Sequence, residues 1–226
     1  MTHRGGHTRP FEQFLAALKR DGCALLVTGD EPALAREVAS KRLFGTTRPD
    51  AETAPRKRLL LTTGKGECPA AYLPGELTGA SESTTVVSTT TATRATVARP
   101  PAEDPEPRSL AAVSAELHEA LSALIDDEPR PSELRVGVTS IRPLLEEYGP
   151  RETRQFVSEL AETVRGYRGM AHVHYPVADD SPAVETVEPV VDARIELRMR
   201  ERASVELRWH TGDETLDDGL SWHPVV

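Results

Sequence analysis

The region between Glu133 and Arg200 alternates strand-like and helix-like patterns, and it constrains the fold more than any other part of the chain. Leu134–Ile141 (LRVGVTSI) is a mainly apolar, β-branched run broken by Arg135, which is typical of a strand covered on both faces. Residues 151–169 (RETRQFVSELAETVRGYRG) carry apolar side chains at helical spacing, and Met170–Val177 (MAHVHYPV) reads as the next strand. A helix of this length between two strands predicts parallel neighbours joined by a crossover. The region therefore predicts an α/β fold.

The rest of the chain extends this pattern at both ends. We expect further helices at 10–21, 32–44 and 109–125, further strands at 23–28, 58–62 and 84–90, a hairpin of 192–200 and 203–209, and a short last strand at 221–224. Asp30 or Glu31 is expected to cap the second helix, and Ser109 the third.

These elements predict one domain over residues 1–226. We expect a mostly parallel central sheet flanked by helices, with the antiparallel C-terminal hairpin at its edge. The strands at 23–28 and 134–141 are both mainly apolar, so we expect them side by side in the centre. An acidic Thr/Pro-rich excursion around 91–107 is expected to leave the domain surface.

The charge balance argues against some classes of partner. The chain has 27 basic and 36 acidic residues, a net charge of −9, and we find no basic patch in the sequence, so nucleic acid is not an expected partner. No apolar run approaches the roughly 20 residues of a membrane span. The opening residues lack a signal-peptide core, and the two cysteines have no metal spacing, so we expect a soluble cytoplasmic protein. An acidic chain with four lysines is typical of a salt-rich cytoplasm, although a GC-rich genome also favours arginine over lysine.

Three segments carry a resemblance to the KaiC/RadA branch of RecA-like ATPases. The run from Leu134 to Pro176 resembles that family's Walker B strand, the helix after it and the next strand. VVDARIELRMR is similar to the family's edge strand, with Asp192 at its acidic position, and a weaker likeness covers Gly22–Thr63. The chain also resembles small transducer-associated RecA-like proteins of halophilic archaea. The resemblance implies a RecA-like fold with a nucleotide cleft.

The phosphate loop that the resemblance implies is incomplete. Such a loop needs Gly-x-x-x-x-Gly-Lys-Ser/Thr, because backbone amides, a lysine and a hydroxyl hold the phosphates and magnesium. Counted from Gly29, these three positions hold Leu34, Ala35 and Arg36. Lys65 lies between two glycines, but it follows the wrong strand and has no hydroxyl after it. The first glycine is therefore the one element of the loop that is kept.

The acidic groups of the family are also replaced. The position of the Walker B aspartate is Thr139, followed by Ser140, and the catalytic acidic pair corresponds to Thr62-Thr63. Hydroxyls cannot supply the charge that a carboxylate brings to magnesium. We therefore predict no catalytic residues, no cofactor and no ATP hydrolysis.

Three further residue groups have a functional and a structural interpretation. His172 and His174 share one face of a strand and could bind a metal with Asp179 or Asp180, but a packed strand-end pair is the expectation we favour. Cys23 opens a buried strand and is expected in the core. Arginines at 194, 198, 200 and 208 alternate with glutamates at 196, 201 and 206, which predicts cross-strand ion pairs rather than a basic stripe.

Two functions follow from these observations. The first is a non-catalytic regulatory or protein-interaction module on a degenerate RecA/KaiC-like scaffold, with a second copy, a RecA-like protein or a signalling protein as partner. The alternative is a switch that binds a nucleotide or another small ligand and that could keep residual ATPase activity. Its vestigial cleft would be lined by Thr28, Gly29, Asp30, Thr139 and Ser140. The discriminating observation is whether Leu34 and Arg36 fill that cleft.

Overall fold

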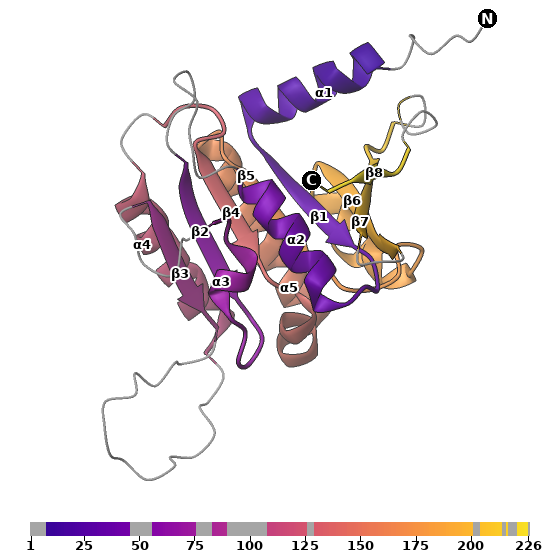
Figure 1. The fold of residues 1–226 in the computed structure, drawn as a ribbon. Coiled ribbons are helices and arrows are strands. Elements are labelled where there is room, and N and C mark those ends of the chain that lie inside the picture. The colour runs from indigo at the N-terminus through magenta and orange to yellow at the C-terminus, as the bar shows by residue number, and fades with distance from the viewer. Residues whose placement is uncertain are drawn as a thin grey trace, which may run out of the picture.

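A computed structural model describes residues 8–45, 56–75, 83–89, 108–125, 129–200, 204–213, 216 and 221–225. In these residues an eight-stranded sheet lies between two sets of helices, as expected for the α/β class (Figure 1). The expected excursion at 91–107 and the hairpin turn at 201–202 lie outside the described residues.

The sheet is mostly parallel and ends in an antiparallel edge. Its strands are β1 (Cys23–Thr28), β2 (Lys57–Thr62), β3 (Thr84–Ser88), β4 (Leu134–Val138), β5 (Met170–His174), β6 (Ala193–Arg200), β7 (Ser204–His210) and β8 (His223–Pro224). Their order is β3-β2-β4-β5-β1-β6-β7-β8, in which β7 and β8 are antiparallel to their neighbours. The predicted hairpin and its position at the edge are therefore confirmed.

The prediction that the strands at 23–28 and 134–141 lie side by side is wrong. β1 and β4 are both central, but β5 lies between them, pairing with Cys23–Val27 on one side and with Arg135–Val138 on the other. A crossover fixes that two strands are parallel, but it does not fix how many strands lie between them. Because β5 is as fully buried as β1 and β4, apolar content could not decide the order of the three.

Helices cover both faces of the sheet. They are α1 (Thr8–Asp21), α2 (Ala33–Phe44), α3 (Pro69–Tyr72), α4 (Leu110–Leu124) and α5 (Arg142–Gly166), with 3-10 turns η1 (Pro182–Thr186) and η2 (Glu188–Val190). α4 and α5 pack on one face, where Leu59, Leu61 and Val136 belong to the largest apolar cluster. α1, α2 and α3 lie on the opposite face, where α2 crosses in front of the central strands (Figure 1).

Two helix ends differ from expectation. α2 begins after Pro32, which has no side-chain acceptor, so the prediction that Asp30 or Glu31 caps this helix is wrong. The helix expected at 151–169 is present, but a further helical segment from Arg142 precedes it, separated by a kink at Gly149. Gly149 has φ of +83° and precedes Pro150, and because such a pair is a turn signal, the sequence pattern did not reveal the helical segment before it. Ser109 caps α4 as predicted, accepting a hydrogen bond from the Ala112 amide.

Candidate functional site

The parallel strands of this sheet end along one edge, and ligands of open α/β sheets bind in crevices along that edge. There β2 ends at Thr62, β4 at Val138, β5 at His174 and β1 at Thr28. The residues of the predicted cleft follow β1 and β4, so they lie on either side of the end of β5.

A carboxylate lies at the ends of β2 and β4. The Glu67 carboxylate accepts from the Thr139 hydroxyl at 2.6 Å and from the amides of Thr63 and Gly64 at 3.1 and 3.0 Å. The Thr63 hydroxyl in turn donates to the Ser140 carbonyl at 2.6 Å. Thr139 and Thr63 are buried, whereas Glu67 is half-buried. The position where the resemblance would place a metal-binding aspartate is therefore a hydrogen-bonded hydroxyl beneath a glutamate.

Glu67 was not among the residues selected from the sequence. It follows β2 within a polar loop, five residues after the last residue of the strand. The one available signal was the resemblance itself, because the ATPases that the chain resembles carry their acidic pair after this strand. Its partner Thr139 is 72 residues away, and no local spacing reports such a contact.

At the end of β1, Thr28 bonds to a different carboxylate, Asp179. The Thr28 hydroxyl donates to Asp179 at 2.5 Å and is therefore turned away from the Thr139 cluster. Gly29 has φ of +118°, and a β-carbon there would lie 2.5 Å from the Leu197 carbonyl oxygen, so only glycine fits. Asp30 is exposed. The structure thus places Thr139 and Ser140 together but joins Thr28 to another group.

Of the two α2 residues that we considered as filling the cleft, Leu34 is exposed, whereas Arg36 lies near His174 at the end of β5. Leu34 is 46% exposed, and Ala35 is the fully buried residue of the first turn of α2. Arg36 donates to the Glu31 carbonyl at 3.2 Å, and its Nε is buried without a hydrogen-bond partner. Leu34 and Ala35 have no polar side chain to replace the lysine, and Arg36 has no hydroxyl to bind the magnesium of a nucleotide.

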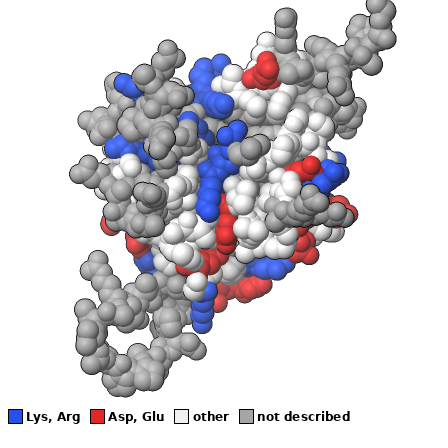
Figure 2. Space-filling view, viewed as in Figure 1, with Lys and Arg blue, Asp and Glu red and all other residues white. Residues whose placement is uncertain are grey.

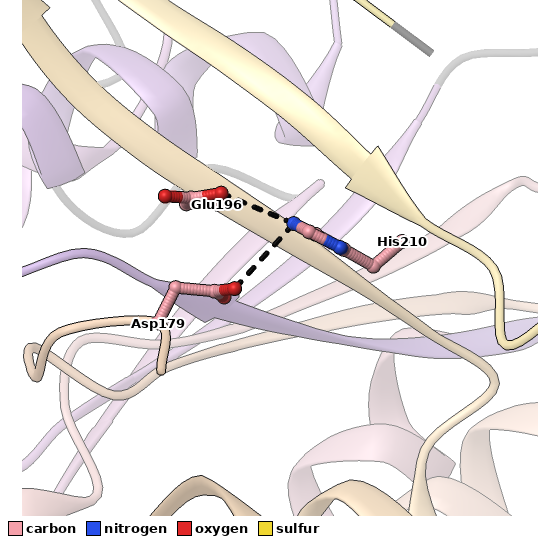
Figure 3. Close-up of side chains that lie close together, drawn as sticks. All are labelled: Asp179, Glu196 and His210. Atoms are coloured by element: carbon pink, nitrogen blue, oxygen red, sulfur yellow. Dashed lines mark hydrogen bonds and ion pairs between the residues drawn. The ribbon is translucent and has the colours of Figure 1, made fainter. Parts of the chain in front are cut away.

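Asp179, Glu196 and His210 form a second polar group at the end of β1 (Figure 3). His210 Nε2 lies 3.1 Å from Glu196 Oε2 and 3.5 Å from Asp179 Oδ2. Arg194 pairs with Asp179 at 2.9 Å, and Arg208 pairs with Glu196 at 2.5 Å. In the described part of the chain this is the one group of three whose atoms could hold a metal ion. Both carboxylates already have guanidinium partners, so a cation would have to compete with them.

The two histidines of β5 lie elsewhere, under α2 and α3. His172 Nε2 is 2.9 Å from the Ser40 hydroxyl, whereas neither ring nitrogen of His174 has a hydrogen-bond partner. Burial lowers the pKa of His172 to about 3, and burial together with the nearby His172 and Arg36 lowers that of His174 well below its usual range. Asp179 lies with His210 rather than with this pair, so these residues do not form a three-ligand group.

The hairpin β6–β7 carries the predicted ion pairs. Arg198 pairs with Glu206 at 2.7 Å and also lies 3.9 Å from the ring centre of Trp222. Arg208 lies over the same ring, at 5.0 Å.

Cys23 is fully buried, as expected, and burial raises the pKa of its thiol to about 12, which makes it a poor nucleophile.

Comparison with known proteins adds one family. A model described as a family of unknown function, DUF7504, matches residues 22–197, which include β1 to β5 and most of β6. No curated protein matches the chain. Within the described residues, no helix has the length and apolar character needed to cross a membrane.

Proposed function

The chain belongs to DUF7504, a family of unknown function, and we propose that it is a non-catalytic regulatory or protein-interaction module on a degenerate RecA/KaiC-like scaffold. We propose further that it acts in the cytoplasm, as a homo-oligomer or bound to a RecA-like or signalling protein. The proposal depends on the site at the carboxyl edge of the sheet.

The contact between Glu67 and Thr139 is the observation that supports a non-catalytic role. One carboxylate oxygen of Glu67 accepts from a hydroxyl and two amides, which is close to the capacity of that oxygen. A catalytic magnesium ion is held by one or two carboxylates together with the phosphates of the substrate, and phosphoryl transfer depends on such groups. Here the Glu67 oxygen that faces Thr139 is already engaged in three hydrogen bonds. A carboxylate held in this way stabilises the loop after β2 rather than binding a metal.

The turn between β1 and α2 supports the same proposal. Its Gly29 is held by a hydrogen bond from its amide to the Val177 carbonyl at 2.8 Å, so this amide does not point toward a phosphate. Asp30 and Glu31 add negative charge at the start of α2, where a triphosphate would be repelled.

Glu67 is also the observation that favours the alternative. A carboxylate after β2, close to the Walker B position, is what a nucleotide switch of this type would use, if Glu67 turned from Thr139 toward a bound metal. The two functions differ in one measurable property, the affinity for MgATP.

Calorimetry with MgATP in high salt tests the proposal. We expect no binding tighter than millimolar, which corresponds to about 4 kcal/mol of binding free energy, and no hydrolysis above background. The Glu67→Gln variant is the matched control, since it removes the carboxylate charge and keeps the shape. A micromolar dissociation constant in the native chain that is lost in Glu67→Gln would establish the nucleotide switch instead.

The regulatory role needs a positive experiment as well. Light scattering gives the oligomeric state, and affinity purification from the native host identifies a partner. A stoichiometric protein partner or a defined oligomer is the expected result. A monomer that captures nothing would contradict the interaction module.

A further inference from the structure

A cavity of about 530 Å³ lies at the opposite end of the sheet, near the amino ends of β1, β4 and β5. It is bounded by α1, the end of α2, and the edge formed by β7 and β8. Its volume falls within the range of small-molecule sites. It shares no residue with the polar groups at the carboxyl edge, so it is independent of the proposed function.

One wall of this cavity is apolar. Phe11 and Leu15 of α1 face Leu207 and Trp209 of β7, and the rings of Phe11 and Trp209 meet edge to face at 5.9 Å. Leu15 and Trp209 are only partly buried although they pack against the core. An elongated apolar ligand that lies against this wall would bury these side chains.

The other wall is basic. Its charged residues are Lys19, Arg42, Arg56 and Arg135, and none of the described residues that line the cavity is acidic. Lys and Arg side chains gather on this part of the surface, near α1 and the end of α2 (Figure 2). This concentration of positive charge stands out in a chain whose net charge is −9.

Arg135 is the deepest of these cations. Its side chain is only 7% exposed, and it donates to the Ser132 carbonyl at 3.2 Å and to the Met170 sulfur at 2.7 Å. Among the described residues, neither Arg135 nor Arg56 has an ion pair with a carboxylate. Burial, together with the nearby Arg56, lowers the pKa of Arg135 to about 9. A buried cation that lacks a counter-charge is costly, and an anion placed beside it would remove that cost.

A purely structural role explains part of this arrangement. Arg135 approaches the Leu43 carbonyl at 3.5 Å, and arginines at a helix C-terminus stabilise the negative end of the helix dipole. A carbonyl dipole does not neutralise a full charge, however, and Arg56 Nε is buried without any hydrogen-bond partner. Neither feature explains why the cations line an open cavity with an aromatic wall.

We propose that this cavity binds an amphiphilic anion, a molecule with an aliphatic body and a carboxylate or phosphate head. The head would lie between Arg56 and Arg135, with Arg42 at the mouth, and the body would lie along Phe11, Leu15 and Trp209. A planar guanidinium pairs with such heads in bidentate geometry. The proposal is for a free molecule in solution rather than a lipid within a bilayer.

Fluorescence of Trp209 tests the proposal. The chain has two tryptophans, so a Trp222→Phe background makes Trp209 the only reporter. Decyl phosphate, below its micellar concentration, is compared with decanol and with inorganic phosphate. We expect decyl phosphate to bind at least about tenfold more tightly than either, since only it uses both walls. It should also raise the melting temperature, as a ligand of the folded state does, whereas surfactant denaturation lowers it.

Two arginine variants locate the head. Arg135→Met removes the buried charge, and Arg42→Gln changes an exposed residue whose loss does not threaten folding. Both are expected to weaken decyl phosphate by about three- to tenfold while leaving decanol unchanged. Arg151→Gln, on exposed α5 surface, is the control and should bind as the native chain does.

Four results would overturn the proposal. These are the absence of binding, equal affinity for decanol and decyl phosphate, equal affinity for inorganic and decyl phosphate, and binding that neither arginine variant changes. Retention of the protein on vesicles of anionic lipid is measured separately. Retention on such vesicles that Arg42→Gln abolishes would assign the basic wall to a membrane surface instead.

Discussion

The hydroxyl of Thr139 donates a 2.6 Å hydrogen bond to the carboxylate of Glu67, and this contact joins the end of β4 to the loop after β2. Thr139 is fully buried, so the contact lies in a medium where an added charge is costly. If the alternative function were correct, a metal ion would bind beside Thr139 and Glu67. Substitutions here therefore separate a structural cluster from a metal site.

Thr139→Asp, which introduces the aspartate that the resemblance to RecA-like ATPases would place here, should destabilise the chain. It places a second carboxylate against Glu67 in a buried position, and we expect a loss of about 3 kcal/mol in the free energy of unfolding. Adding Glu67→Gln removes the repulsion but not the cost of burying a charge, so it should recover only part of the loss. Urea unfolding with and without magnesium measures both. If magnesium stabilised the native chain and Glu67→Gln abolished that effect, the site would be a metal site and the non-catalytic proposal would fail.

A second prediction concerns acid stability and the pair His172 and His174. The folded-state pKa of His172 is about 3, below the roughly 6.5 of an unfolded histidine, so below pH 6.5 the unfolded chain binds the extra proton. This contribution to stability is complete above pH 6.5 and is lost as the pH falls toward 3. Each such histidine contributes a slope of up to about 1.4 kcal/mol per pH unit.

His174→Leu tests this slope, because it removes a ring whose two nitrogens lack partners. Urea unfolding between pH 7.5 and pH 5 should show a shallower loss of stability for this variant than for the native chain. His118→Gln, an exposed position on α4, is the control and should keep the native slope. An unchanged slope in His174→Leu would mean that this histidine is not held neutral by the fold.

The third prediction concerns the absence of a side chain at Gly137. The rings of Phe44 and His172 meet over it with centroids 4.7 Å apart, and a β-carbon would lie 2.5 Å from Phe44 Cζ. Gly137→Ala should cost about 2 kcal/mol, since an added methyl in a packed core forces side chains from their preferred positions. Gly166→Ala, where nothing lies within 4 Å, should be neutral or stabilise the chain by up to about 1 kcal/mol. Equal effects of the two would show that α2 packs more loosely on β4 than described.

The sequence determines local structure here better than it determines long-range contacts. The strand at Cys23–Thr28 and the Ser109 cap were predictable, because apolar runs and capping residues act within a few positions. The insertion of β5 between β1 and β4 was not, because strand order depends on packing across the whole sheet. Glu67 and the cavity beside Arg135 depend on contacts between distant segments, and these leave no periodic signal.

The fourth prediction separates ion pairing from metal binding at Asp179. Its side chain is 12% exposed and bonds both Thr28 and Arg194, so Asp179→Asn should cost about 1–3 kcal/mol, while the exposed Asp180→Asn should cost little. A chelator should leave the melting temperature of the native chain unchanged. A rise with zinc that Asp179→Asn abolishes would instead show that Asp179, Glu196 and His210 hold a cation.

The last prediction concerns salt. A net charge of −9 repels itself at low ionic strength, and at 1 M salt the Debye length falls to roughly 3 Å, which removes most of that repulsion. Salt also weakens pairs such as Arg198–Glu206, but partly exposed pairs of this kind contribute only about 0–1 kcal/mol each. The relief of repulsion should therefore dominate, and the melting temperature should rise from low salt toward molar potassium chloride. A melting temperature that stays constant over this range would contradict adaptation to a salt-rich cytoplasm and would leave a GC-rich genome as the reason for the arginine-rich composition.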